Sequence, residues 1–373
     1  MDDNNTLRGN CRTISDPKFG AAYRVLEDAI AAGAFPGCAF GVLVNGEVVI
    51  QDARGRFTYE ESSPPVTSGT VFDLASVSKV VATTATAMLL YQRGQLDLDA
   101  KLGDLLPEFV RGREPDDPAR RVMLRHLLAH NSGLPAYVEF FRTVQTPAEL
   151  LNACMRLKLE AEPGTRADYS DPGFTLLGKA LEAAMGEALD AFSKREIFGP
   201  LGMEATCYRP AHEIWSAIPP TEEDAAFRHR RIQGEVQDEN AWVLGGVAGH
   251  AGLFSNVPDV LRFAGELLRS QADDSDENNL FQATVVNIFG NRQGPGDSSR
   301  ALGWDTPSAD SSSGRYFSPR SIGHLGYSGC SLWIDLEARL AVVLLTNRTW
   351  PDRKSLLIRQ VRPAFHDAIR RAI

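Results

Sequence analysis

Two side chains in the first quarter of the chain have the types and the spacing needed for acyl transfer. Ser76 and Lys79 stand three positions apart, where a turn gives way to the apolar run 80–90. Residues i and i+3 share a face of a helix, so the hydroxyl and the amine would lie side by side. A lysine can take the proton of a serine only when desolvation or nearby positive charge keeps part of it neutral. The apolar helix supplies that desolvation, and its N-terminus favours an oxyanion.

The same spacing occurs a second time, so the pattern alone does not identify a site. Ser15 and Lys18 also stand three positions apart, but Pro17 lies between them and no apolar helix surrounds them. We interpret this copy as a cap before a helix that begins near Pro17. For Ser76, the competing interpretation is an N-cap serine followed by a solvated Lys79 one turn later.

Composition places the chain among soluble globular proteins. Its 373 residues are 43% hydrophobic and 23% charged, which suits one large domain or two ordinary ones. The formal net charge of −9, with no basic stripe, argues against a nucleic-acid partner. No apolar run approaches the roughly 20 residues of a membrane span, and the polar N-terminus lacks the apolar core of a signal peptide. We therefore expect a cytoplasmic protein, or a periplasmic one if a leader has been removed.

The cysteines suggest neither a disulfide framework nor a metal site. Their number is odd, and none forms a CxxC pair. The sequence has no HExxH motif or comparable ligand cluster, so we expect no metal and no cofactor. Reduced thiols are the expected state of all five, which are Cys11, Cys38, Cys154, Cys207 and Cys330.

Hydrophobic periodicity predicts strands at both ends of the chain and helices in the middle. The Asn45-Gly46 pair between two apolar runs is a strong hairpin signal. The expected strands cover residues 39–44, 47–50, 324–327, 331–335 and 341–345. The expected helices cover residues 17–32, 76–92, 122–130, 146–159 and 173–185, with one starting near Pro258 and one from about Arg353 that is broken or restarted at Pro363.

This order of elements predicts an α+β architecture in which an all-helical lobe is inserted into a sheet domain. We expect a discontinuous sheet domain formed by residues 17–98 and 242–373, and a helical lobe formed by residues 99–241. The hairpins make the sheet antiparallel. Residues 1–16 are expected to form a mobile N-terminus.

Two further motifs accompany Ser76 and Lys79. A Tyr-Ser-Asp tripeptide at 169–171 stands before a predicted helix, and a His-Leu-Gly tripeptide at 324–326 stands on a late strand. In this order the three motifs resemble those of the serine β-lactamase and penicillin-binding-protein superfamily, on its class C β-lactamase and esterase side. The resemblance extends over about residues 17–370, and it also includes the segments 125–135 and 302–304.

The resemblance implies a β-lactamase/DD-peptidase-like fold, with the active site in the cleft between sheet domain and helical lobe. It also implies roles. Ser76 would attack a carbonyl and become acylated, and Lys79 would act as base. Tyr169 would carry a proton to the leaving group and help to activate the deacylating water, titrating with Lys79 as a coupled pair. The backbone N–H groups of Ser76 and Tyr327, next to Gly326, would form the oxyanion hole. The competing interpretation of Tyr169 is a packed loop aromatic with a satisfied hydroxyl.

Two residues depart from the pattern of β-lactamases. Asp171 stands where asparagine is usual; an ionised carboxylate only accepts hydrogen bonds, so it could pair with Lys79 and hold it charged. His324 stands where a lysine usually helps to bind the substrate carboxylate, and imidazole is mostly neutral at pH 7. Both changes weaken the case for an anionic β-lactam and favour esters, peptides or amides.

Segments 218–224, 232–241 and 245–255 narrow the resemblance to a subgroup that includes bacterial enzymes acting on cell-wall muropeptides, among them amidases. In that subgroup we expect histidine where this chain has Gln237, which weakens any transfer of substrate. The glycine-rich stretch is also consistent with a flexible turn before a helix. We interpret His250 within it as structural rather than catalytic.

The leading hypothesis is a serine hydrolase that forms an acyl-enzyme from an ester or amide, with muropeptide amides or small carboxyl esters as candidates. One alternative is a true β-lactamase or D-alanyl-D-alanine carboxypeptidase. A second is a catalytically silent binding module, against which the intact Ser76, Lys79 and Tyr169 argue. The expected partner is a small-molecule or peptide substrate, and the sequence does not set the oligomeric state.

Overall fold

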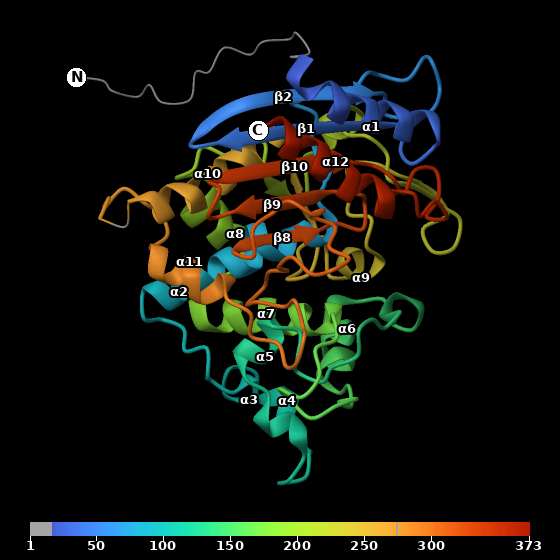
Figure 1. The fold of residues 1–373 in the computed structure, drawn as a ribbon. Helices are drawn as coiled ribbons and strands as arrows, with labels where there is room; N and C mark the ends of the chain where they lie inside the picture. Colours follow the sequence, from blue (N-terminus) through green and yellow to red (C-terminus); the bar gives the residue numbers. More distant parts are fainter. Residues whose placement is uncertain (1–16, 274) are drawn as a thin grey trace, which may run out of the picture.

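The computed structural model describes residues 17–273 and 275–373 (Figure 1). The N-terminus expected to be mobile, together with Cys11, Ser15 and Asp16, lies outside the described residues. The strands are β1 (Gly37–Val44), β2 (Glu47–Gly55), β3 (Phe72–Asp73), β4 (Cys207–Tyr208), β5 (Glu222–Asp224), β6 (Arg230–Ile232), β7 (Leu253–Ser255), β8 (Ser321–Leu325), β9 (Ser331–Asp335) and β10 (Leu340–Thr346). The helices are α1 (Gly20–Ala31), α2 (Ala85–Gln92), α3 (Leu102–Leu105), α4 (Pro107–Val110), α5 (Leu124–Leu128), α6 (Pro147–Met155), α7 (Asp171–Met185), α8 (Leu189–Ser193), α9 (Glu239–Val243), α10 (Val257–Ala272), α11 (Ala283–Gly290) and α12 (Ile358–Ala372).

A five-stranded antiparallel sheet in the order β2-β1-β10-β9-β8 forms the main body, which confirms the predicted fold class. The first and last strands of the chain meet at its centre, where Val42 lies opposite Val342. Asn45 and Gly46 join β1 to β2, and both have positive φ, as the tight hairpin turn requires.

The strict alternation of side chains along a strand gives the central strands two buried faces. On one face Phe40 and Val342 pack with Phe365 of α12 and with α1. On the other face Leu43 and Val343 belong to the larger core that includes α2 and α10. This explains why β1 and β10 read as continuous apolar runs instead of alternating ones.

Helices α3 to α7 lie together beyond the β8 edge of the sheet (Figure 1). Helix α2 lies between this group and the sheet, so the helix that follows Ser76 sits at the junction. Residues 218–239, although expected in the helical lobe, hydrogen-bond to the end of the sheet: Asn347 Nδ2 donates to Pro220 O, and the N–H of Glu223 donates to Pro351 O, both at 2.9 Å.

The segment expected to be one helix over 76–92 consists of three consecutive pieces. A 3-10 turn, η2 (Ala75–Val77), is followed by a π-helical stretch, η3 (Lys79–Thr84), and then by α2. Single π-helical turns within helices are rare and frequently accompany functional sites. The prediction of a regular helix was therefore wrong at the end that carries the chemistry.

Two other predicted boundaries were also wrong. Strand β8 ends at Leu325, so Gly326 and Tyr327 lie in the turn that follows it. Helix α12 begins at Ile358 and continues through Pro363 without a break. A proline there removes one intrahelical hydrogen bond, and the burial of Val361, Phe365 and Ile369 at four-residue intervals against the sheet keeps the helix intact.

Within residues 17–273 and 275–373, no helix is long and apolar enough to cross a membrane, and no group of His, Cys, Asp or Glu side chains is arranged to hold a metal ion. The four cysteines in this part of the chain are free thiols.

Candidate active site

Ser76 and Lys79 face each other as their spacing predicts. Lys79 Nζ lies 3.0 Å from Ser76 Oγ, and the lysine side chain is fully buried, while Ser76 is partly exposed. The buried stretch that follows, from Val80 onward, provides the apolar surroundings. The alternative of a solvated lysine beside a capping serine is therefore wrong.

The turn that presents Ser76 is held in a strained conformation. Ala75 has a φ of 47°, a region that residues with a Cβ rarely adopt. Its N–H donates to Asp73 Oδ1 at 2.8 Å, and its carbonyl accepts from the Ser78 hydroxyl at 2.5 Å. These local bonds hold the nucleophile's turn in place before any substrate binds.

Asp171 forms an ion pair with Lys79, with 2.7 Å between Oδ1 and Nζ. Burial alone would lower the pKa of the Lys79 ammonium, but the charge of Asp171 and the Tyr169 hydroxyl outweigh burial, so this pKa lies above its ordinary value. Lys79 is therefore a cation at neutral pH in the free protein.

Tyr169 completes this group. Its hydroxyl interacts with both Lys79 and Ser76, and Lys79 Nζ lies 4.8 Å from the centre of its ring. Burial raises the pKa of Tyr169, and the charge of Lys79 offsets this only in part. The guanidinium of Arg300 also lies over the ring, at 5.1 Å from its centre. Tyr169 is thus a neutral phenol between two cations.

His130 fixes the loop that carries Tyr169. Its ring stacks on Phe174 and lies 4.5 Å from the Tyr169 ring, centre to centre. The N–H of Ser170 donates to His130 Nδ1 at 2.9 Å. Burial, with the charges of Arg300 and Lys79, holds the pKa of His130 well below its ordinary value. The ring is therefore neutral, with its proton on Nε2.

His250 contributes its backbone to the site. Its carbonyl oxygen accepts a hydrogen bond from Lys79 Nζ at 2.9 Å. This approach depends on the preceding Gly249, where a Cβ would lie 2.1 Å from the carbonyl oxygen of Phe174. The His250 ring is held by the Thr175 hydroxyl at 2.9 Å and by Asp238 at 3.0 Å. The interpretation of His250 as structural agrees with these contacts, although its carbonyl touches the lysine.

His324 also lies near the Tyr169 ring, with 5.8 Å between ring centres. Burial and the charges of Lys79 and Arg300 hold its pKa well below the ordinary value, so the ring is neutral. Nδ1 donates to the Leu325 carbonyl at 2.9 Å, which leaves Nε2 as an acceptor without a partner among the described residues. Only 3% of His324 is exposed, so it cannot present a cation to a substrate carboxylate.

Gly326 brings the turn after β8 close to the nucleophile. A Cβ at this position would lie 2.4 Å from the carbonyl oxygen of Leu74, so only glycine allows the approach. The next residue, Tyr327, has its carbonyl fixed by Arg348 Nε at 2.8 Å, and the Arg348 guanidinium lies 4.3 Å from the centre of its ring. Tyr327 is therefore held in place by Arg348, although its side chain is half exposed.

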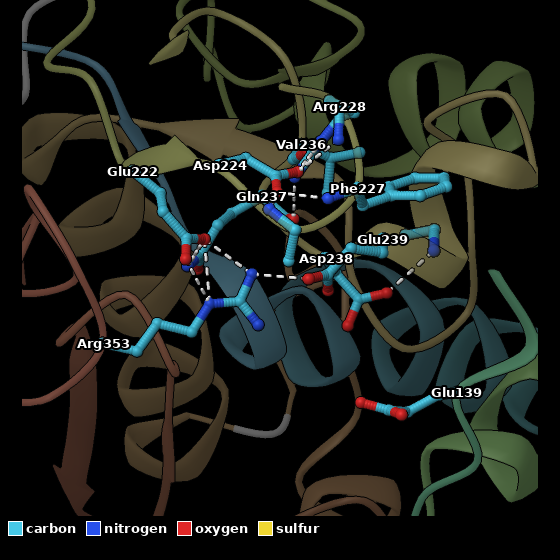
Figure 2. A network of polar contacts seen from close by, with 12 residues as sticks. Glu139, Glu222, Asp224, Phe227, Arg228, Val236, Gln237, Asp238, Glu239 and Arg353 are labelled. Atoms are coloured by element: carbon cyan, nitrogen blue, oxygen red, sulfur yellow. Dashed lines mark hydrogen bonds and ion pairs between the residues drawn. The ribbon is translucent and has the colours of Figure 1, made fainter. Parts of the chain in front are cut away.

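Three side chains close to this group form what we call the rim: Tyr137, which is near the charges of Arg353 and Asp171, Tyr327, which follows Gly326, and Arg353. Tyr137 and Tyr327 are 43% and 52% exposed, in contrast to the buried Lys79. Arg353 lies 5.9 Å from the centre of the Tyr327 ring and forms ion pairs with Glu222 and Glu239, both at 2.6 Å. Figure 2 shows this guanidinium between the two carboxylates.

The motifs identify the central residues, but they miss several that support them. His130 stands in the segment 125–135, which matches the family without an assigned role, and Arg300 stands in a loop that none of the motifs includes. Asp73 was overlooked although a buried acid between Phe72 and Leu74 is unusual in an apolar run, and that is the signal that could have identified it.

Comparison with known proteins agrees with this arrangement. The family model described as Beta-lactamase matches residues 23–363. The chain belongs to the beta-lactamase family. Members of this family are serine hydrolases, and this protein is accordingly an enzyme of that class.

The chain is 29% identical to the N-acetylmuramyl-L-alanine amidase of Bacillus subtilis (strain 168), over 90% of this chain and 82% of the relative. It is 28% identical to a protein of Escherichia coli (strain K12) that is provisionally named a D-alanyl-D-alanine carboxypeptidase, over 84% and 79%.

Two solved structures share the fold. EstCE1, a hydrolase with promiscuous acyltransferase activity, has a TM-score of 0.75 at 23% identity and covers 96% of this chain and 100% of its own. The octameric penicillin-binding protein homologue from Pyrococcus abyssi has a TM-score of 0.70 at 21% identity, over 88% and 73%. Identities this low support the fold alone.

Proposed function

We propose that this enzyme hydrolyses an amide bond of cell-wall muropeptides through an acyl-enzyme on Ser76. The observation that carries the proposal is the contact of Ser76 Oγ with a buried Lys79 that Asp171 and Tyr169 surround. The substrate class is supported by the similarity to the Bacillus subtilis amidase over 90% of this chain.

In the proposed acylation step, Ser76 Oγ attacks the carbonyl carbon of the substrate while its proton passes to the Lys79–Tyr169 pair. The N–H groups of Ser76 and Tyr327 would stabilise the oxyanion of the tetrahedral intermediate, a contribution of about 3–4 kcal/mol per donor in other hydrolases. The C–N bond then breaks, and the leaving amine takes a proton from the pair.

In deacylation, a water molecule gives its proton to the same pair and attacks the ester carbonyl. Ser76 recovers its proton as the acid leaves.

The charges of the site support a mechanism in which Tyr169 carries most of this proton transfer. Lys79 is tied as a cation to Asp171, so in the free protein it has no lone pair for the serine proton. The phenol of Tyr169 touches both Ser76 and Lys79, and its deprotonated form is stabilised by the ammonium. The base form of the pair is therefore the phenolate beside the ammonium, and it becomes more populated as pH rises.

The state of His324 bears on the choice of substrate. A β-lactam or a D-alanyl-D-alanine peptide carries a carboxylate next to the bond that is broken, and a buried, neutral imidazole does not attract it. This favours the amide over these two alternatives. The carboxypeptidase activity remains the second candidate because of the similarity to the Escherichia coli protein, and small carboxyl esters remain the third.

The test is a direct comparison of substrates. The enzyme is incubated separately with N-acetylmuramyl-L-alanyl-D-isoglutamine, a peptide ending in D-alanyl-D-alanine, nitrocefin and p-nitrophenyl acetate. Products are measured by mass spectrometry or absorbance, with Ser76→Ala as the control. We expect release of the peptide from the muramyl amide and no turnover by Ser76→Ala.

Free D-alanine from the second substrate, without cleavage of the first, would establish the carboxypeptidase instead. Activity confined to p-nitrophenyl acetate would establish an esterase. Full turnover by Ser76→Ala would refute the nucleophile.

A further inference from the structure

Four consecutive residues at the start of α9, the 237–240 segment, are each bonded to a different part of the active site. None of the four belongs to the catalytic group described above. The segment lies beside Arg353 and Glu222 in Figure 2. Its contacts divide into two halves, one directed at the reacting groups and one at the rim.

The first half of the segment reaches the nucleophile through Asp73. The N–H of Gln237 donates to Asp73 Oδ2 at 2.8 Å, while Asp73 Oδ1 accepts from the N–H of Ala75 at 2.8 Å. One carboxylate thus ties the strained turn before Ser76 to this segment. Asp73 is 2% exposed, so water does not compete for either bond.

The first half also reaches the base. Asp238 Oδ1 lies 3.0 Å from His250 Nε2, and the carbonyl of His250 accepts from Lys79 Nζ. Burial would raise the pKa of Asp238, but His250, the N–H of Ala241 and the charge of Lys79 lower it to about 2. Asp238 is therefore ionised throughout the working pH range and holds the His250 ring at all times.

The second half of the segment reaches the rim. Glu239 Oε1 accepts from Arg353 Nη2 at 2.6 Å, which fixes the guanidinium beside Tyr327. Asn240 Nδ2 donates to the Val138 carbonyl at 2.8 Å, and its Oδ1 accepts from the N–H of Phe141 at 3.1 Å. These last two bonds fix both ends of the stretch 138–141, directly after Tyr137.

The segment itself is rigidly held, as a positioning element must be. Arg228 donates to the carbonyls of Val236 and Gln237, at 2.7 and 2.6 Å, and forms an ion pair with Asp224 at 2.9 Å. Both partners of that pair are at most 3% exposed. Figure 2 shows these contacts converging on the segment.

We propose that the 237–240 segment is the positioning element of this active site, in which Gln237 and Asp238 set the nucleophile and the base while Glu239 and Asn240 set the rim. The proposal rests on the proposed roles of Ser76 and Lys79. Because these are two separate sets of bonds, changes in the first half slow the reaction of every substrate. Changes in the second half affect only substrates large enough to reach the rim.

The experiment compares Asp73→Asn and Asp238→Asn with Asn240→Ala and Glu239→Gln, with the exposed Asp116→Asn as the control. Two readouts are used on protein checked for folding by circular dichroism. One is the rate at which a small fluorophosphonate labels Ser76, followed by mass spectrometry. The other is kcat and KM for p-nitrophenyl acetate and for the muramyl amide.

We expect Asp73→Asn and Asp238→Asn to slow both labelling and kcat by about 10- to 100-fold, because small displacements of reacting groups have effects of that size. Asn240→Ala and Glu239→Gln should leave labelling and ester turnover within about twofold of the unchanged enzyme. In the same two variants, KM for the muramyl amide should rise about three- to tenfold, a change that corresponds to roughly 1 kcal/mol.

The pH dependence of Ser76 labelling distinguishes a positioning role of Asp73 from a purely structural one. Burial raises the pKa of Asp73 to about 6, although the hydrogen bonds from the N–H groups of Gln237 and Ala75 lower it in part. The charged or titratable neighbours of Asp73 are Asp238, Arg228 and Cys330. Protonation removes one of its two accepting oxygens, so labelling of the unchanged protein should fall more steeply below about pH 6 than the Lys79–Tyr169 pair alone requires. Asp73→Asn should be slow and should lack this additional fall, keeping only the pH dependence of the Lys79–Tyr169 pair.

The outcomes are distinguishable. If the unchanged protein is not labelled at Ser76, the nucleophile assignment and the positioning role both fail. If it is labelled but Asp238→Asn and Asp73→Asn react at the same rate, only the positioning role fails. If those two variants do not fold, equal effects of Asn240→Ala on the small ester and on the muramyl amide would overturn the division into halves.

Discussion

The floor of the active site, formed by Ser76, Lys79, Tyr169 and Asp171, differs from its rim in exposure and in bonding. Lys79 is fully buried and donates hydrogen bonds to the Ser76 hydroxyl, the Asp171 carboxylate and the His250 carbonyl, besides its contact with the Tyr169 hydroxyl. Tyr327 on the rim is 52% exposed and is held mainly through its backbone and the arginine beneath it. The floor has one geometry, whereas the rim has side chains that can change without disturbing that geometry.

This difference separates the residues that control the reaction from those that control the choice of substrate. Buried, fully bonded groups can hold pKa values away from their ordinary range, as Lys79 and Tyr169 do. Exposed aromatic side chains offer contact area but little control of charge. We therefore expect substitutions in the floor to act on kcat and on pH dependence, and substitutions on the rim to act on KM.

The largest effect is expected from Tyr169→Phe, which removes only the hydroxyl that touches Ser76 and Lys79. We expect kcat for p-nitrophenyl acetate to fall about 10²- to 10⁴-fold, the usual contribution of a general acid–base group. Tyr91→Phe, on α2, is the matched control and should keep full activity. A Tyr169→Phe enzyme with normal kcat would mean that Lys79 alone moves the proton.

Gly326→Ala tests the close approach between the floor and the turn below the rim. The added Cβ would lie 2.4 Å from the Leu74 carbonyl, so turn and nucleophile must move apart. We expect a loss of about 1–3 kcal/mol of stability, measured by urea unfolding, and a lower kcat. Gly69→Ala, with no atom closer than 4.0 Å, is the control and should be neutral. An unchanged kcat would mean that the turn after β8 does not contribute to the oxyanion hole.

Asp171→Asn tests the charge of the floor. Asp171 raises the pKa of Lys79, so the substitution lowers that pKa, and the base form of the Lys79–Tyr169 pair appears at lower pH. We expect the rising limb of the kcat/KM profile to move to lower pH by about one to three pH units, with a modest change of kcat at its plateau. A limb that stays in place, or moves to higher pH, would contradict the ion pair's role.

The smallest effect is expected from Tyr327→Ala on the rim. It keeps the backbone N–H proposed for the oxyanion hole and removes only the exposed ring. We expect KM for the muramyl amide to rise about three- to tenfold, equivalent to roughly 1 kcal/mol, while kcat changes less than about threefold. Tyr59→Ala, a similarly exposed ring, should have no effect. A large fall of kcat would show that the Tyr327 ring takes part in the reaction and would contradict the distinction between rim and floor.

The sequence was sufficient for the parts of the site that local patterns specify. The spacing of Ser76 and Lys79 predicts their contact, and the hairpin at Asn45-Gly46 predicts the order of the first strands. The pairing of Asp171 with Lys79 was foreseen from chemistry, since a carboxylate beside an ammonium has few other options.

The remainder depends on contacts between distant parts of the chain. The carbonyl of His250 reaches Lys79 across 171 positions of sequence, and no side-chain pattern reports a backbone acceptor. The N–H of Gln237 reaches Asp73 across 164 positions in the same way. The π-helical stretch Lys79–Thr84 was missed because its apolar residues fit a regular helix equally well.

Arg362 of α12 links the last residues of the chain to the turn after β8. Its guanidinium donates to the carbonyls of Gly326 and Cys330, at 2.6 and 2.8 Å, and it is only 6% exposed. During synthesis these carbonyls are therefore made before their partner, which follows them by 36 and 32 positions in the sequence. A chain that stops before Arg362 would leave both carbonyls without this partner, so the turn that carries Gly326 and Tyr327 depends on a residue far beyond it in the sequence.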